Sequence, residues 1–180
     1  MLKNTFPIII DERLLLRPFR ISDIFSLALH ANNKKISDNL NDGFPYPYTE
    51  KNAIEFIDSL KNDHPPKILA IVYKEAVVGA IGIFPQSKVQ RLNAELGYWV
   101  GEKYWGNGIA SGAVRSMLAY TFENFDLIRI YARPFPHNPA SQRVLEKSGF
   151  KLEARIKNGL CKNDTIFDEL IYSILKEDFI

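Results

Sequence analysis

KYWGNGIASGA, residues 103–113, joins two closely spaced glycines to the start of an amphipathic helix. Gly106 and Gly108 lack a Cβ, so the backbone there can turn tightly and bring several N–H groups together. The first N–H groups of a helix have no intrahelical partner, and the helix dipole favours an anion beside them by about 0.3–1 kcal/mol. The stretch therefore predicts a binding site for a phosphate or pyrophosphate.

Hydrophobic spacing places this loop between a strand and a helix. The segment AELGYWV at 94–100 is short and aromatic, which is typical of a strand. After the loop, apolar residues recur at the i, i+3 and i+4 positions of one buried helical face: Ala110, Ala113, Val114, Met117, Leu118, Phe122 and Phe125. The predicted unit is therefore strand, glycine loop and helix.

The glycine spacing excludes two common nucleotide-binding loops. The chain contains no Gly-x-x-x-x-Gly-Lys-Ser/Thr string, so no Walker loop is present. The dinucleotide fingerprint requires a third glycine where Ser111 stands, although Gly112 follows one position later. Taken alone, the loop is equally compatible with a tight strand-to-helix connection.

A second motif follows at 138–150, NPASQRVLEKSGF. Asn138 suits the N-cap of a helix, Pro139 suits its first position, and Gly149 suits the residue just beyond its end. Local rules alone explain these residues as a well-delimited short helix. The combination with the glycine loop is more specific.

Together the two motifs resemble the GNAT superfamily of acyl-coenzyme A-dependent N-acyltransferases. That family has a Gln/Arg-x-x-Gly-x-Gly/Ala loop, then a helix, a strand and a short helix that begins Asn-x-x-Ala/Ser and ends Gly-Phe. This chain has KYWGNG at 103–108, NPAS at 138–141 and SGF at 148–150. Within the superfamily it is similar to the serine and alanine N-acetyltransferases of ribosomal proteins. Lys103 and Gly112 depart from the pattern, which has Gln or Arg and commonly Glu at these positions.

The order of segments predicts one domain, residues 1–180, of mixed α/β (α+β) architecture. The resemblance likewise implies a GNAT-like fold with a central mixed, partly antiparallel sheet flanked by helices. A hairpin through Lys74–Ala76 makes part of the sheet antiparallel. Strands are expected at Arg13–Pro18, Ile68–Tyr73, Val77–Phe84, 94–100, Ile128–Arg133, Phe150–Ile156 and Ile166–Leu175, and the first two helices at Ser22–His30 and after Thr49.

Composition excludes several other classes of protein. The 23 basic and 21 acidic residues are interspersed and give a net charge of +2, so nucleic-acid binding is not predicted. No apolar run approaches the roughly 18 residues of a membrane span, and the N-terminal segment is too short in apolar residues for a secretory signal. The single Cys161 cannot form an internal disulfide. We expect a cytoplasmic monomer or homodimer with no metal site.

The resemblance implies acetyl-coenzyme A as the cosubstrate and direct attack of a primary amine on its thioester. Backbone near Val100 would polarise the thioester carbonyl, and an N–H group aimed at the developing charge is worth several kcal/mol. The implied cofactor contacts are Trp99, Val100, Lys103, Gly106, Asn107, Gly108, Ile109, Ala110, Asn138 and Ser141.

The catalytic residues follow less directly from the resemblance. The family often has a tyrosine seven residues after the motif asparagine as the acid for the leaving thiolate, but this chain has Leu145 there. In the ribosomal branch the serine three residues after the asparagine is implicated, which here is Ser141; the alternative is that Ser141 only belongs to the first helical turn. Glu95 is the candidate base, or else half of a strand salt bridge. Asp168 is a second candidate base.

The acceptor is predicted from proton chemistry. An α-amino group of pKa ~7.7–8.0 is about a tenth neutral at pH 7, whereas lysine is almost wholly protonated. A site with weak bases therefore favours a protein or peptide N-terminus, and ribosomal proteins are the implied partners. Tyr46, Tyr48 and Tyr98 are the predicted acceptor contacts. A small-molecule acetyltransferase (amino acid, polyamine or antibiotic) and a noncatalytic acyl-coenzyme A-binding module remain alternatives. His30 is expected on a helix surface.

Overall fold

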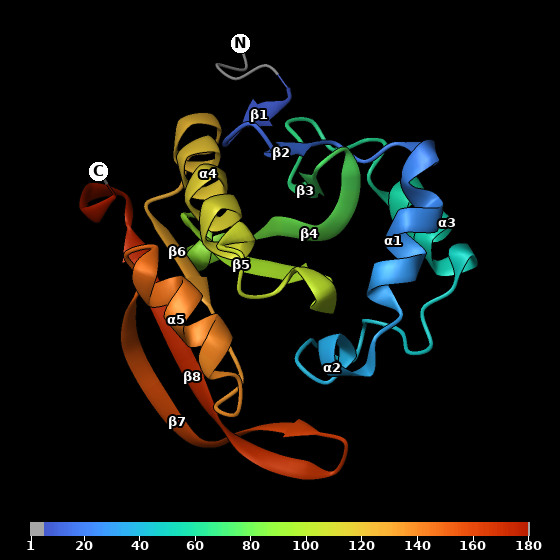
Figure 1. The fold of residues 1–180 in the computed structure, drawn as a ribbon. Helices are drawn as coiled ribbons and strands as arrows, with labels where there is room; N and C mark the ends of the chain where they lie inside the picture. The colour runs from blue at the N-terminus through green and yellow to red at the C-terminus, as the bar shows by residue number, and fades with distance from the viewer. Residues whose placement is uncertain (1–5, 180) are drawn as a thin grey trace.

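Eight strands form one sheet in the computed structural model, which describes residues 6–179 (Figure 1). Along the sheet they are ordered β1-β2-β3-β4-β5-β6-β8-β7, and every neighbouring pair is antiparallel except β5 with β6. Their bounds are β1 (Ile8–Ile9), β2 (Leu14–Arg17), β3 (Ile68–Tyr73), β4 (Ala76–Pro85), β5 (Asn93–Val100), β6 (Arg129–Ala132), β7 (Lys151–Lys162) and β8 (Thr165–Leu175).

Helices cover both faces of this sheet (Figure 1). They are α1 (Ile24–Ala31), α2 (Lys34–Ser37), α3 (Glu50–Ser59), α4 (Ile109–Asn124) and α5 (Pro139–Lys147), with 3-10 turns at Ile21–Asp23, Lys88–Gln90, Glu102–Tyr104 and Lys176–Asp178. None of the helices within residues 6–179 is both long enough and apolar enough to cross a bilayer.

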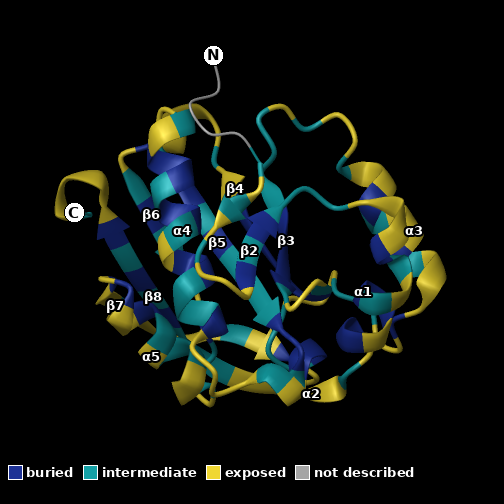
Figure 2. Ribbon diagram, turned by 45° about the horizontal axis from the view of Figure 1, so that its top comes forward, coloured by how far each residue is buried: buried dark blue, intermediate teal, exposed yellow. Residues whose placement is uncertain are grey.

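Alternating side chains along the strands supply the two hydrophobic layers. Leu14, Leu16 and Ile71 pack in the larger core with α4, whereas Ala70 and Val72 lie in a separate cluster on the opposite face. A third cluster joins α1 to α3. In Figure 2 the buried residues accordingly lie along the strands and the inward sides of the helices.

The two parallel strands at the centre of the sheet pair over only part of their length. β5 pairs with β4 from Ala94 to Val100, but its pairing with β6 stops at Glu95 opposite Tyr131. One edge of residues 96–100 is therefore open. This opening positions the functional site.

The predicted mixed α/β architecture with a partly antiparallel sheet is confirmed. The prediction for the last hairpin was too short, because β7 continues to Lys162 through two register irregularities before Asn163 and Asp164 turn the chain at φ 50° and 58°. The two-residue β1 and one-turn α2 were not predicted. His30 is buried rather than on the surface: its ring packs against Gly101 and Tyr104, and burial followed by the Lys103 charge lowers its pKa.

Candidate active site

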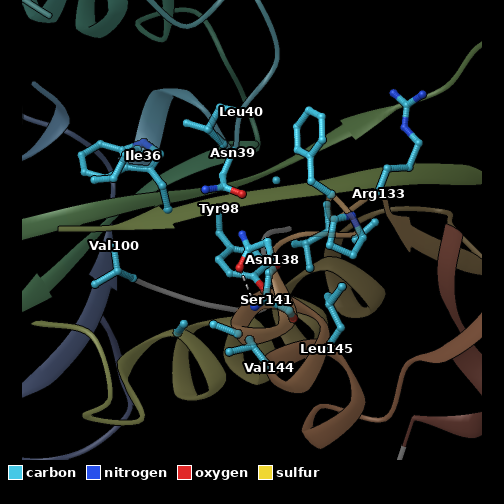
Figure 3. A pocket seen from close by; sticks show the side chains of 18 of the residues that line it. Ile36, Asn39, Leu40, Tyr98, Val100, Arg133, Asn138, Ser141, Val144 and Leu145 are labelled. Carbon is cyan, nitrogen blue, oxygen red and sulfur yellow. Dashed lines mark hydrogen bonds between the residues drawn. The ribbon is translucent and has the colours of Figure 1, made fainter. Parts of the chain in front are cut away.

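A cavity of about 890 Å³ opens where β5 and β6 separate. Its walls come from the open part of β5, the glycine loop and the start of α4, α5, the segment after α2, and the distal part of β7. Figure 3 shows Tyr98 and Val100 of β5 around it, together with Ser141 and Val144 of α5 and the N-cap residue Asn138. The volume lies in the range of small-molecule and cofactor sites.

The glycine loop forms an anion cradle at one end of the cavity. Gly106 and Gly108 have φ values of 78° and 75°, and no atom lies within 4 Å of the Cβ that either would carry in another residue. The first N–H that donates within α4 is that of Gly112, to the Gly108 carbonyl at 3.0 Å. The N–H groups of residues 109–111 therefore have no intrahelical acceptor, and no side chain caps them. This geometry fits a pyrophosphate.

The side chains of Trp105 and Asn107 stabilise the glycine loop through hydrogen bonds to backbone carbonyls. Trp105 donates its indole N–H to the Val100 carbonyl at 2.6 Å, and Asn107 donates to the carbonyls of Tyr104 and Trp105 at 3.1 Å each. Lys103, a predicted cofactor contact, does not line the cavity; its Nζ lies 5.0 Å from the centre of the Tyr104 ring. Its cation is directed to an aromatic face, and a contact of Lys103 with the cofactor stays a prediction.

The backbone N–H of Val100 points toward the open edge of β5. Gly101 N–H donates to the Val78 carbonyl at 2.7 Å, and hydrogen-bonding direction alternates along an antiparallel strand. The Val100 N–H therefore points away from β4, on the side where β6 is absent. A fixed N–H there suits a developing oxyanion.

Ser141 and Tyr98 form a hydroxyl pair beside this edge. Asn138 caps α5 by accepting from the Ser141 N–H at 3.1 Å, which holds the serine in the first turn. The Tyr98 hydroxyl oxygen lies 2.8 Å from Ser141 Oγ (Figure 3). Burial raises the pKa of Tyr98 to about 12, although the contact with Ser141 acts in the opposite direction. Tyr98 therefore keeps its proton throughout the physiological range.

Glu95 lines the cavity but is held in an ion pair. Arg133 donates its Nε to one carboxylate oxygen at 3.0 Å and a terminal nitrogen to the other at 2.7 Å, and it also binds Glu169 at 3.1 Å. These hydrogen bonds, the one to Glu95 foremost, raise the pKa of Arg133. The second candidate base, Asp168, does not line the cavity; hydrogen bonds from Arg155 and the Asn158 N–H lower its pKa.

Residues 13–151 match the family model described as the acetyltransferase (GNAT) domain. The chain belongs to the GNAT acetyltransferases. The uncharacterized N-acetyltransferase p20 of Bacillus licheniformis is 28% identical over 174 residues, which cover 93% of this chain and 96% of p20. The ribosomal-protein-serine acetyltransferase of Escherichia coli K12 is 30% identical over 105 residues, 57% of this chain and 58% of that enzyme.

Solved structures confirm the GNAT fold. RimL, a ribosomal L7/L12 α-N-protein acetyltransferase solved with coenzyme A, superimposes with a TM-score of 0.82 at 21% identity over 94% of this chain and 97% of RimL. The predicted family, the acetyltransferase activity and acetyl-coenzyme A as cosubstrate are confirmed.

The predicted acceptor contacts of this GNAT enzyme are only partly brought to the cavity. Tyr48 is buried in the cluster between α1 and α3, and Tyr46 is exposed; neither lines the cavity. The role of these two tyrosines as acceptor contacts, inferred from the aromatic character of their loop, stays a prediction. Trp99 lines the cavity, but its ring packs on the α1–α3 face, 6.0 Å from Phe44. Tyr98 does line it, on the side of Ser141.

The GNAT cavity also includes residues that the motifs did not indicate. Arg143 and Lys147 are exposed on α5 at helical spacing, a signal that the sequence does carry. Asn39 and Asp42 come from the segment after α2, and Lys162 from the end of β7. No local pattern marks these three, because they meet only through the fold.

Proposed function

We propose that this enzyme transfers an acetyl group from acetyl-coenzyme A to the α-amine of a protein or peptide N-terminus. The pairing of both Glu95 oxygens with Arg133 carries the choice of acceptor, since it holds the one predicted base that lines the cavity in an ion pair. An α-amine needs little help from a base because about a tenth of it is neutral at pH 7. The similarity to a ribosomal-protein-serine acetyltransferase supports the same acceptor class.

The cavity residues would hold the cosubstrate, which supplies the activated acetyl thioester. Backbone N–H groups of residues 109–111 would bind the pyrophosphate, with Arg143 and Lys147 adding positive charge on the same cavity. The open edge of β5 offers main-chain hydrogen-bonding groups to the amides of the cosubstrate, in the way that it would pair with an added strand. The Val100 N–H would stabilise charge on the acetyl oxygen.

Ser141 is the proposed acid. If the Tyr98 hydroxyl donates a hydrogen bond to Ser141 Oγ, the proton of Ser141 is free to go to the thiolate that departs as the amine nitrogen bonds to the acetyl carbon. The proton that this nitrogen loses then restores the serine hydroxyl. Tyr98 can sustain this arrangement because its pKa of about 12 keeps it protonated. A thiol has a pKa near ~8.5, so the thiolate is a fair leaving group and the acid is expected to contribute only about tenfold.

Glu95 remains a proposed base, with its ion pair as the alternative role. Glu95→Gln separates the two possibilities. Loss of about a hundredfold in kcat with unchanged acetyl-coenzyme A affinity supports a base. A loss of thermal stability with kcat within a few-fold of wild type supports a structural ion pair with Arg133.

The function is tested by measuring acetyl-coenzyme A turnover with a panel of amines. Hexapeptides beginning Ser, Ala or Thr are compared with spermidine, free amino acids and an aminoglycoside. We expect the peptides to give the highest kcat/KM; exclusive turnover of small amines would refute the proposed acceptor. Ser141→Ala should lower kcat about tenfold. Ser148→Ala is its matched control, because Ser148 lies at the other end of α5 and donates to the Val144 carbonyl at 2.8 Å.

A further inference from the structure

Asn39 lines the cavity, and its side chain carries a hydrogen-bond acceptor without a partner. Its Nδ2 donates to the Lys35 carbonyl at 2.8 Å, which fixes the orientation of the amide, because a flipped amide would place two oxygens against each other. The Oδ1 atom is shielded from solvent and has no hydrogen-bond partner within the part of the chain that the structure describes. Buried acceptors without a donor are rare and costly, so a ligand is the natural source of the missing donor.

The segment that carries Asn39 is held in place from both sides. Asn33, just before α2, donates to Glu102 at 2.7 Å, and Lys35 forms an ion pair with the same carboxylate beside the glycine loop. On the other side Lys162 donates to Asp42 at 2.7 Å, which joins the segment to the end of β7. The side-chain carbonyl of Asn39 is therefore positioned before any ligand binds.

Asn39 lies on the side of the cavity opposite the cofactor-holding residues. Figure 3 shows Asn39 and Leu40 across β5 from the side chains of Asn138 and Ser141. A molecule held by Asn39 would thus approach the open strand edge from the side away from α5. This is the approach required of an acceptor amine, since the cradle and α5 occupy the other side.

We infer that Asn39 Oδ1 accepts a hydrogen bond from an N–H of the neutral primary amine that is acetylated. A neutral primary amine has two N–H groups and one lone pair. Binding one N–H to Asn39 would turn the lone pair toward the thioester and leave the second N–H free. Asn39 is then a positioning residue for the acceptor. The inference rests on the proposed transfer to a primary amine, but not on that amine belonging to a peptide.

The test uses steady-state kinetics with whichever amine of the panel wild type acetylates, together with calorimetric binding of acetyl-coenzyme A. Asn39→Ala should lower kcat/KM for the amine about tenfold, mainly through KM, with acetyl-coenzyme A affinity within twofold of wild type. Asn39→Leu keeps the side-chain volume and should show the same rise in KM without a fall in melting temperature. The matched control is Asn41→Ala, since Asn41 Oδ1 already accepts from the Gly43 N–H at 3.0 Å.

Three results would overturn the role of Asn39. They are an unchanged KM for the amine in both variants, an equal loss in Asn41→Ala, or a parallel loss of acetyl-coenzyme A affinity, which would assign the carbonyl to an amide of the cofactor. If the acetylated amine is a small molecule and Asn39→Ala raises its KM, the proposed peptide acceptor is refuted and the role of Asn39 is supported. If peptides are acetylated and Asn39→Ala leaves their KM unchanged, the peptide acceptor is supported and the role of Asn39 is refuted.

Discussion

Replacing Gly108 with alanine tests the anion cradle directly. Gly108 caps α4 at φ 75° and ψ −3°, a conformation that glycine adopts freely and L-residues adopt at a cost of about 1–2 kcal/mol. Because no atom lies within 4 Å of the added Cβ, the substitution introduces no collision in the ligand-free protein. The effect on the ligand-free protein is therefore conformational.

That cost must appear in folding stability, in cofactor affinity, or divided between them. If the variant loop keeps the wild-type conformation, the cost lowers the free energy of unfolding. If the loop relaxes, the wild-type conformation must be restored when coenzyme A binds, and the cost lowers the affinity. We expect the two losses to sum to about 1–2 kcal/mol, so a fully relaxed loop weakens coenzyme A binding about five- to thirtyfold. Urea denaturation and isothermal titration with coenzyme A measure the two parts on the same preparation.

Gly112→Ala is the matched control. Its Cβ would lie 3.2 Å from Leu14 Cδ2 and 3.3 Å from Ile10 Cγ2, at the ends of two side chains, and away from the cavity. The gain in helix propensity, about 1 kcal/mol, offsets that crowding. Coenzyme A affinity should be unchanged. Wild-type affinity and stability in Gly108→Ala, or equal weakening in Gly112→Ala, would refute the role given to the loop.

Three further outcomes follow from the contacts. Tyr98→Phe should lower kcat three- to tenfold at unchanged coenzyme A affinity, while wild-type kcat should show no loss from Tyr98 ionisation up to pH 10, because its pKa is about 12. Burial lowers the pKa of His30, so below about pH 6.5 the unfolded chain binds a proton more readily than the folded protein does. Urea denaturation should therefore give a smaller free energy of unfolding at pH 5.5 than at pH 7.5, and the difference should be smaller in His30→Gln. Asp42→Asn removes the partner of Lys162, whose side chain is 9% exposed; with Asp42 itself 77% exposed, we expect about 1 kcal/mol less stability and faster hydrogen exchange at the end of β7. An unchanged kcat in Tyr98→Phe, the same pH dependence of stability in His30→Gln as in wild type, or unchanged hydrogen exchange in Asp42→Asn would contradict the respective prediction.

Much of the cradle could be predicted from sequence because its determinants are local. Two glycines at positive φ, a capping asparagine with Pro139 after it, and the apolar spacing of α4 all act within a few residues of themselves. Their spacing also led to the family. The explanation for Gly112 was not local: Leu14 of β2 and Ile10, just after β1, approach it.

The sequence was least informative where several segments meet. The aromatic residues after Asp42 suggested an acceptor cleft, but Tyr48 is used in the packing of α1 against α3. Glu95 stood out as a carboxylate on a central strand, and only the fold shows Arg133 and Glu169 beside it. Sequence spacing cannot place partners that lie on different strands.

By itself, the sequence determined how the phosphate end of the site is made, since turn geometry and helix termini depend on neighbouring residues. The tertiary structure decided the rest of the cavity. It separated β5 from β6 beyond Glu95, brought Tyr98 to 2.8 Å from Ser141, and placed Asn39 beside the end of β7. These contacts join residues 43 or more positions apart, and they depend on the order of strands in the sheet, which no short stretch of sequence encodes.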